Sequence, residues 1–263
     1  MFRLNLRGSI SGESSERFWS GNTSVSASRV TESHKLVLST RANGDRSEFD
    51  VVDEAEGIDT TYVSTRTSYG ANAYSVWSLS PHWSAGAVAE ANRASTVNLA
   101  LGVQGGPAIE YSVFPYAEST RRQLTILYTV GAAASDYVEE TVYDKTSEVR
   151  PVHSLQIDLD VQQPWGSVHG SIDGFQYLHD LAKHSLRLEG RLSLRVFRGL
   201  DFNMGANVAR IKDQLYLPKE DLTAEEILLR VRARETNFRY GLNLGLSFRF
   251  GSKFNNVVNP RMW

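Results

Sequence analysis

The chain has 263 residues, of which 41% are hydrophobic and 22% charged, with a formal net charge of −2 and a pI near 6.3. This length allows a single domain, and so balanced a charge gives no basic field for binding nucleic acid. The absence of cysteine excludes a disulfide framework, a thiolate metal site and a cysteine nucleophile.

No apolar run approaches the roughly 18 residues of a membrane helix, and the mean hydropathy is −0.31. A membrane β-barrel remains compatible with these values, because only every second residue of its strands faces lipid. Met1 is followed directly by alternating Phe2, Leu4 and Leu6, with no signal peptide before them. A membrane β-barrel of the bacterial outer membrane would need an export signal, so on that interpretation we expect the native N-terminus to lie upstream.

Alternation of apolar and polar residues marks a series of segments along the chain. It begins near 2–11, is weaker near 21–30, 35–43, 60–79 and 83–91, and is clearer at 97–103, 124–130, 155–161, 185–197, 202–208 and 239–250. In the last segment every second residue from Tyr240 to Phe250 is apolar. A period of two predicts β-strands with one apolar and one polar face.

The connections between these segments alternate in length. Short turns are predicted near 31–34, 80–83, 115–119, 163–166 and 197–200, and long polar connections near 12–20, 47–59, 91–95, 133–151, 178–183 and 212–234. This pattern joins twelve strands with both termini on the short-turn side, which is typical of outer-membrane barrels. Aromatic residues beside the short turns, such as Trp77, Trp83 and Trp165, suit a membrane–water boundary.

We therefore predict an all-β, transmembrane antiparallel up-and-down β-barrel of about twelve strands over residues 1–250, followed by a tail at 251–263. Pairing of the segment near 2–11 with that near 239–250 would close it. The alternative interpretation is a soluble β-sandwich, lipocalin-like barrel or propeller, whose apolar face points inward. Alternating runs of about ten residues, longer than the usual soluble strand, favour the membrane barrel.

Four stretches of the sequence resemble a family of Gram-negative bacterial outer-membrane β-barrel proteins. These are Phe114–Leu124, Pro164–Val168, Gln176–Asp180 and Phe250–Pro260, of which the last is the most specific. The resemblance implies an outer-membrane location, contact with membrane lipid and lipopolysaccharide, and recognition by the barrel-assembly machinery during biogenesis. Members typically carry a signal peptide and a small periplasmic segment before the barrel. The resemblance brings no established activity with it, and we expect no cofactor.

If the apolar face meets lipid, the alternating charged residues line the lumen. The predicted lumen charges are Arg3, Arg7, Arg41, Arg66, Glu110, Asp158, Asp160, Asp173, Arg187, Arg191, Arg195, Arg239 and Arg249, together with Lys35, His169, Glu189 and Asp201. Closure would place Arg239 and Arg249 beside Arg3 and Arg7 as a basic wall, opposite an acidic stretch formed by Asp158, Asp160 and Asp173. Opposed walls carry a transverse field that favours polar or zwitterionic solutes.

Two functions follow from two states of the lumen. An open lumen would make the protein a pore or transport channel for small polar solutes. A lumen filled by paired charges would make it a structural or anchoring barrel, because charges removed from water must be paired.

A barrel-embedded hydrolase is the third hypothesis, and the sequence supports it least. His153 and Ser154 are adjacent on a strand and point to opposite faces. His169 and Ser171 share a face but lie about 7 Å apart along the strand, too far for a hydrogen bond. We therefore expect no enzyme and no catalytic residue.

The long connections offer two further features. Carboxylates gather in the second, with Asp50, Asp53, Glu54, Glu56 and Asp59, and in the fourth, with Glu139, Glu140, Asp144 and Glu148. Such oxygens can hold Ca²⁺ or Mg²⁺, but solvated acidic loops are the commoner case, and we expect no metal. In the sixth, residues 223–226 suit a helical capping box, while alternation over 229–234 equally suits an extended strand.

Overall fold

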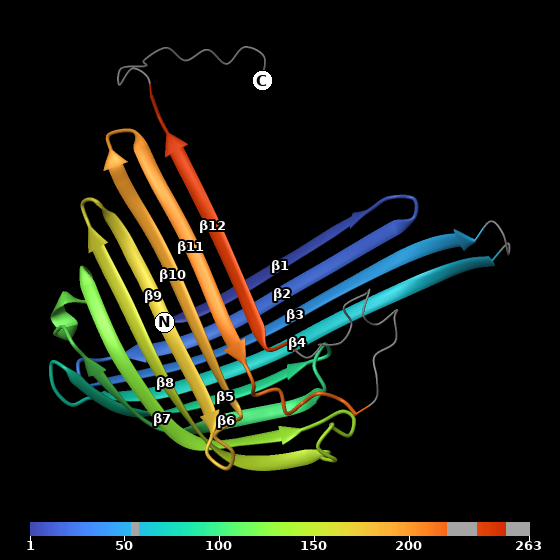
Figure 1. The fold of residues 1–263 in the computed structure, drawn as a ribbon, viewed down its shortest axis with the longest axis horizontal. Coiled ribbons are helices and arrows are strands. Elements are labelled where there is room, and N and C mark those ends of the chain that lie inside the picture. Colours follow the sequence, from blue (N-terminus) through green and yellow to red (C-terminus); the bar gives the residue numbers. More distant parts are fainter. Residues whose placement is uncertain (54–57, 220–235, 251–263) are drawn as a thin grey trace.

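The computed structural model describes residues 1–53, 58–219 and 236–250, which form twelve β-strands and one short 3₁₀ helix (Figure 1). The strands are β1 Phe2–Gly12, β2 Glu16–Val30, β3 His34–Asp53, β4 Ile58–Ser78, β5 Trp83–Ala94, β6 Leu99–Ser112, β7 Arg122–Asp136, β8 Ser147–Gln163, β9 Gly166–Tyr177, β10 His184–Phe197, β11 Leu200–Ile211 and β12 Phe238–Phe248. The helix η1 spans Tyr116–Glu118.

All twelve strands belong to one sheet, in which the spatial order is the order along the chain from β1 to β12. Every neighbouring pair is antiparallel, from the pairing of β1 with β2 to that of β11 with β12. The predicted all-β fold with twelve antiparallel up-and-down strands is therefore confirmed. Among the described residues, no helix has the length and apolar character needed to cross a membrane.

The predicted closure of the sheet is not formed in this structure. Strand β1 is hydrogen-bonded to β2 and strand β12 to β11, and the two free edges are not paired with each other (Figure 1). The unpaired backbone N–H and C=O groups of both edges are exposed. Because water can form hydrogen bonds with these groups, the edges need not pair with each other in water. An apolar medium offers no such partner. The sheet is curved but open, and the barrel remains a prediction.

Several of the predicted long connections are wrong in extent, because the strands continue into them. The connection between β1 and β2 is only residues 13–15, whereas 12–20 was expected. Strands β3 and β4 run to Asp53 and from Ile58, so most of the predicted loop at 47–59 is strand. The polar residues there alternate within a hydrogen-bonded ladder, for example Arg17 opposite Glu48, and solvated strand ends need no apolar face. The five short turns lie where they were predicted.

Cross-strand register divides the side chains into two faces, since directly paired residues point to the same side of a sheet. Following the partners from β12 to β8, Leu242 pairs with Ala206, Ala206 with Gly190, Gly190 with Gly170, and Gly170 with Leu159. From β1 to β8, Leu4 leads in the same way through Val25, Thr40, Ala71, Ala91, Val103 and Ala134 to Val149. One face is therefore apolar across all twelve strands.

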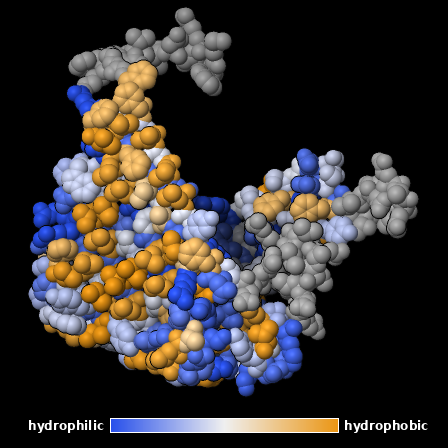
Figure 2. All heavy atoms as spheres, viewed as in Figure 1, coloured by the Kyte–Doolittle hydropathy of each residue, from blue (hydrophilic) through white to orange (hydrophobic). Residues whose placement is uncertain are grey.

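The apolar face is exposed along the whole sheet. Leu242, Leu244 and Leu246 of β12 have 62%, 65% and 74% of their surface exposed. Hydrophobic residues run along this strand and over its neighbours in Figure 2. The opposite, polar face lines a hollow formed by the curvature of the sheet. The described part of the chain thus has no apolar core between layers, and a soluble sandwich with its apolar face inward is contradicted.

Strands β6 and β7 approach closely at three glycines. A Cβ atom added to Gly131 would lie 2.0 Å from the carbonyl oxygen of Gly105, and one added to Gly106 would lie 2.0 Å from that of Val130. The regular pairing of the two strands is interrupted here, beside Pro107, which has no N–H to donate. Only glycine allows the two backbones to remain at this distance.

We expect Gly131→Ala to lower the free energy of unfolding by about 1–3 kcal/mol, because the added methyl group must push the two backbones apart. Gly190→Ala is the matched control, since a Cβ atom at this strand glycine meets nothing within 4 Å. Equilibrium unfolding in denaturant measures both variants. Equal stability of the two would contradict the close approach.

Candidate functional site: the polar face

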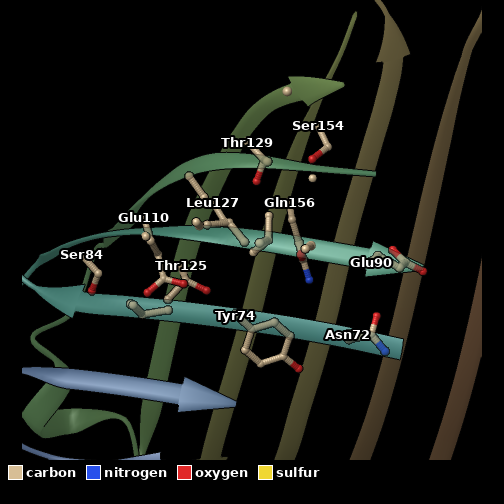
Figure 3. A pocket seen from close by; sticks show the side chains of 18 of the residues that line it. Asn72, Tyr74, Ser84, Glu90, Glu110, Thr125, Leu127, Thr129, Ser154 and Gln156 are labelled. Atoms are coloured by element: carbon tan, nitrogen blue, oxygen red, sulfur yellow. The ribbon is translucent and has the colours of Figure 1, made fainter. Parts of the chain in front are cut away.

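The polar face of strands β4 to β8 encloses a hollow of about 590 Å³. Amide, hydroxyl and carboxyl groups from these strands point into it, among them Asn72, Glu90, Glu110, Thr125 and Gln156 (Figure 3). The aromatic side chain of Tyr74 lines the same hollow. The strands place these groups side by side because each occupies the inward position of its ladder.

All the charged residues predicted for the lumen belong to the polar face by register. Direct cross-strand pairs include Arg187 with Asp173, Arg195 with Asp201, and Gln156 with Asp173. Arg249 follows the end of β12 and bonds to Asp201 of the same face. The prediction that these residues line the lumen of a closed barrel is not tested by an open sheet.

Charge on the polar face is divided between two groups of strands. Strands β5 to β9 carry Glu90, Glu110, Asp158, Asp160 and Asp173, together with Arg150 and Glu148 of β8, which form an ion pair with each other. Strands β10 to β12 and β1 to β4 carry Arg187, Arg191, Arg195, Arg239, Arg3, Arg7, Lys35, Arg41 and Arg66. The described carboxylates on these latter strands are fewer, namely Glu16, Asp45, Glu189 and Asp201. The two groups would face each other across a closed sheet.

The predicted basic wall is not assembled in this structure. Arg3 and Arg7 lie on β1, Arg239 and Arg249 lie at β12, and these edge strands are not paired. Arg249 instead places Nη2 2.7 Å from Oδ2 of Asp201, which Arg195 also approaches at 3.9 Å. The alternation of the last strand located Arg249 but not this partner on the neighbouring strand.

Arg3, Arg7 and Arg239 form no ion pair within the ranges that the structure describes, and the same holds for Arg41 and Arg66. Their cationic groups are therefore available to a solute or to a partner across the hollow.

The histidines considered for the alternative hypothesis of a hydrolase do not form a catalytic triad with other described residues. His153 lies between Tyr128 Oη, 3.1 Å from Nδ1, and Gln176 Oε1, 2.9 Å from Nε2. His169 Nδ1 is 2.8 Å from Asp160 Oδ1, while Ser171 donates to Asp173 at 3.4 Å. Of the hydroxyl groups in the described ranges, none is hydrogen-bonded to His169, so this Asp–His pair has no nucleophile to activate.

Sequence reasoning missed one histidine–serine contact. His34 Nε2 and Ser75 Oγ lie 2.8 Å apart on the apolar face, brought together by the register of β3 and β4. No described carboxylate orients His34, whose ring packs against Trp77 at 5.2 Å between centroids. The alternation of the two segments could have placed both residues on one face, but their register was not known.

The connection between β6 and β7 folds over the short-turn end of the polar face. Tyr116 of η1 donates its hydroxyl hydrogen to Glu110 Oε1 at 2.8 Å and lies 2.8 Å from Ser84 Oγ. Burial and the neighbouring Glu110 carboxylate raise the pKa of Tyr116 to about 12, so this phenol stays protonated at neutral pH.

A segment after β11, residues 212–219, crosses the long-loop end of the polar face (Figure 1), and we call it the strap. Val142 N donates to Leu217 O at 3.0 Å, and Lys219 N donates to Glu140 O at 2.9 Å, so the strap pairs with the connection between β7 and β8. Leu215 is only 5% exposed and Thr141 is fully buried. The strap thus reaches from β11 back across β10, β9 and β8.

Ion pairs link the strap to the acidic connection between β7 and β8. Lys219 Nζ lies 2.5 Å from Asp144 Oδ1 and 3.6 Å from Glu140 Oε2. The hydrogen bond from Lys219 holds the pKa of Asp144 below its ordinary value. The same contact raises the pKa of Lys219.

The described carboxylates of the fourth long connection, which were considered as metal ligands, contact other protein side chains instead. Asp144 and Glu140 face Lys219, and Glu148 accepts a hydrogen bond from Tyr137 at 2.5 Å. Among the described residues no group of three or more His, Asp or Glu side chains has the geometry of a metal site. Glu54, Glu56 and the predicted capping box at 223–226 lie outside the described residues, as does the tail at 251–263.

Comparison with known proteins adds no assignment: no protein-family model matches the chain, and a search of curated proteins found no match.

We expect Asp144→Asn to loosen the strap, seen as faster hydrogen exchange at the amides of Val142 and Lys219. Asn tolerates the left-handed backbone of Asp144, whose φ is 56°. Because the folded-state pKa of Asp144 is lowered, its contribution is present above the ordinary aspartate pKa and is lost as the pH falls through the lowered value. The wild-type protein should therefore show the same faster exchange, beyond the intrinsic pH effect, only in acid.

Asp136→Asn is the control, because it removes an equal charge nearby from a residue that has no ion pair within the described ranges. Unchanged protection in Asp144→Asn would contradict the fastening role of this ion pair.

Proposed function

We propose that the chain forms a twelve-stranded β-barrel in the outer membrane of a Gram-negative bacterium, and that it provides a passage for small polar solutes. The curved sheet would close, its apolar face would contact lipid, and its polar face would line the passage. The four stretches that resemble outer-membrane barrel proteins support the same location.

The observation that carries the membrane proposal is a charge-free belt on the apolar face. On this face, the charged residues whose side chains the structure describes lie towards the ends of the strands, and on the long strand β3 they begin at Arg46: Arg17, Arg29, Arg46, Glu48, Asp50, Arg93, Arg122, Asp136 and Arg210. Between them each strand presents only uncharged residues outward, apart from the titratable His153 on β8. A charged rim at the long-loop ends, with Arg29 and Arg122 at the short-turn ends, borders an apolar belt that matches the profile of a lipid bilayer, whereas water requires no such belt.

The size of the inward side chains supports an open lumen. A twelve-stranded barrel with strands tilted by about 40° has a backbone radius of about 12 Å. Many inward positions are serine or glycine, including Ser9, Ser11, Ser20, Ser24, Ser26, Ser28, Ser167, Ser171, Gly205, Gly241, Gly245 and Ser247. Such short side chains cannot fill a space of this width.

The division of charge on the polar face supports polar or zwitterionic solutes. Carboxylates of β5 to β9 would oppose the arginines of β10 to β12 and β1 to β4 across the lumen. This arrangement orients a dipolar molecule and admits both signs of charge, while the hydroxyl and amide groups between them replace its hydration.

A structural barrel with a closed lumen is the second candidate, and one observation favours it. The strap buries Leu215 and Thr141 at the long-loop end of the polar face, and Asp201 holds Arg249 and Arg195. A barrel whose lumen is blocked in this way would anchor a partner or the membrane without conducting.

Lipid contact predicts a sharp difference between two adjacent positions of β10. Leu192 belongs to the apolar face and Ser193 to the polar face. We expect Leu192→Arg to lower barrel stability in lipid vesicles by about 2–4 kcal/mol, because a cation at mid-strand would face hydrocarbon. Ser193→Arg, the matched control, should fold with little loss. Equal tolerance of the two variants would refute lipid contact.

Planar-bilayer recording tests the passage. We expect the wild-type protein to conduct, and Arg239→Gln to shift its ion preference towards cations with little change in stability, since Arg239 has no ion pair in the described ranges. Arg249→Gln should also lower stability, because it removes a partner of Asp201. Absence of conductance, together with a large loss of stability in Arg239→Gln, would overturn the pore and favour the anchoring barrel.

A further inference from the structure

The two free edges of the sheet expose backbone groups from residues of the same face. Ser28 N donates to Met1 O and Glu13 N donates to Glu16 O, so the odd-numbered residues of β1 bond to β2 and its even-numbered residues face the free edge. Ile211 N donates to Asn237 O and Arg249 N donates to Gly199 O, which leaves the even-numbered residues of β12 facing its free edge. Both edges therefore present the backbone groups of outward-facing residues.

We propose that β1 and β12 pair in one register, in which Phe2 lies opposite Phe248, Leu4 opposite Leu246 and Gly12 opposite Phe238. This inference rests on the proposed function in that it requires the sheet to close. The seam would be antiparallel and would keep every inward residue inward, because the number of strands is even.

Strand length supports this register. Both β1 and β12 have 11 residues, and pairing Phe2 with Phe248 matches them over their full length. A shift by two residues in either direction, the smallest shift that preserves the faces, leaves two residues of each strand without a strand partner. In a membrane those residues would expose unsatisfied backbone groups to an apolar medium.

Charge excludes the shift in one direction. The shift that sets Leu4 opposite Phe248 would place Arg3 directly opposite Arg249. Like charges directly opposite each other destabilise a strand pair. In the proposed register Arg3 faces Ser247 and Arg7 faces Asn243, so each arginine has a small or polar neighbour. The outward pairs are apolar, with Leu6 opposite Leu244 and the small Gly8 opposite Leu242.

The stagger of the sheet agrees with this seam. The line of partners that begins at Leu4 meets β8 at Val149, and the line that begins at Leu242 meets it at Leu159, ten residues further along. The proposed seam sets Leu242 opposite Gly8, four residues from Leu4, so the total stagger around the barrel is about fourteen residues. Twelve strands with this stagger tilt by about 39°, within the roughly 35–45° of transmembrane barrels.

Disulfide formation tests the register directly, because the natural chain has no cysteine. Asn5 and Gly245 would be a directly opposed, non-hydrogen-bonded pair, whose Cα separation of about 4.5 Å suits a disulfide. A Cβ atom at Gly245 has room, with Asn203 no nearer than 3.9 Å. We expect Asn5→Cys with Gly245→Cys, oxidised in lipid vesicles, to give a reduction-sensitive shift in the mobility of the monomer.

Two comparison pairs share Asn5→Cys and combine it with Asn243→Cys or Ser247→Cys; in the proposed register these lie diagonally at about 7–8 Å, so no cross-link should form. Ser193→Cys with Asn203→Cys, a register pair of β10 and β11, is the positive control for folding and oxidation.

Each outcome has one meaning. Cross-linking through Asn243→Cys or Ser247→Cys instead of Gly245→Cys overturns the register but leaves a closed barrel. A positive control that cross-links while all three seam pairs stay reduced, or give only linked dimers, overturns closure of the sheet on itself and with it the proposed barrel.

Discussion

Backbone hydrogen bonding between antiparallel neighbours is the constraint from which the rest of this structure follows. Eleven ladders join twelve strands, and each ladder fixes which residues share a face. Because apolar residues keep the same parity from strand to strand, one slipped register would place a row of leucines among the carboxylates. The sorting of side chains between the two faces and the pairing of the strands therefore depend on each other.

The fold was largely predictable because its main signal is local. A strand such as β10 shows its period of two within its own residues, from Leu186 to Val196, and needs no knowledge of its neighbours. The strand ends were less predictable. Residues 47–53 alternate in a ladder but are too polar to be distinguished from a loop, because a solvated strand needs no apolar face. Closure depends on two edges some 230 residues apart in the sequence, and no local pattern states whether they meet.

In the candidate site, too, the features that depend on local alternation were predictable and those that depend on register were not. Parity alone located Glu110, Asp158 and Arg187 on the polar face. It did not reveal that Asp201 would hold Arg249, or that Tyr116 would reach Glu110 from a connection, because both contacts depend on register and on the path of an aperiodic segment. The strap shows this limit most clearly, since Lys219 and Asp144 lie 75 residues apart and neither belongs to a periodic pattern.

The strap also has a consequence for the order in which the molecule assembles. Every strand pairs with a neighbour in the sequence, so each hairpin closes a short loop at a small entropic cost. The contacts of Lys219 with Glu140 and Asp144 close a loop that contains four whole strands, β8 to β11. The entropic cost of closing this loop becomes small only after the intervening hairpins have formed and shortened the effective chain, so we expect the strap to form late in folding. Disruption of the strap should therefore mainly speed unfolding and leave the rate of folding almost unchanged.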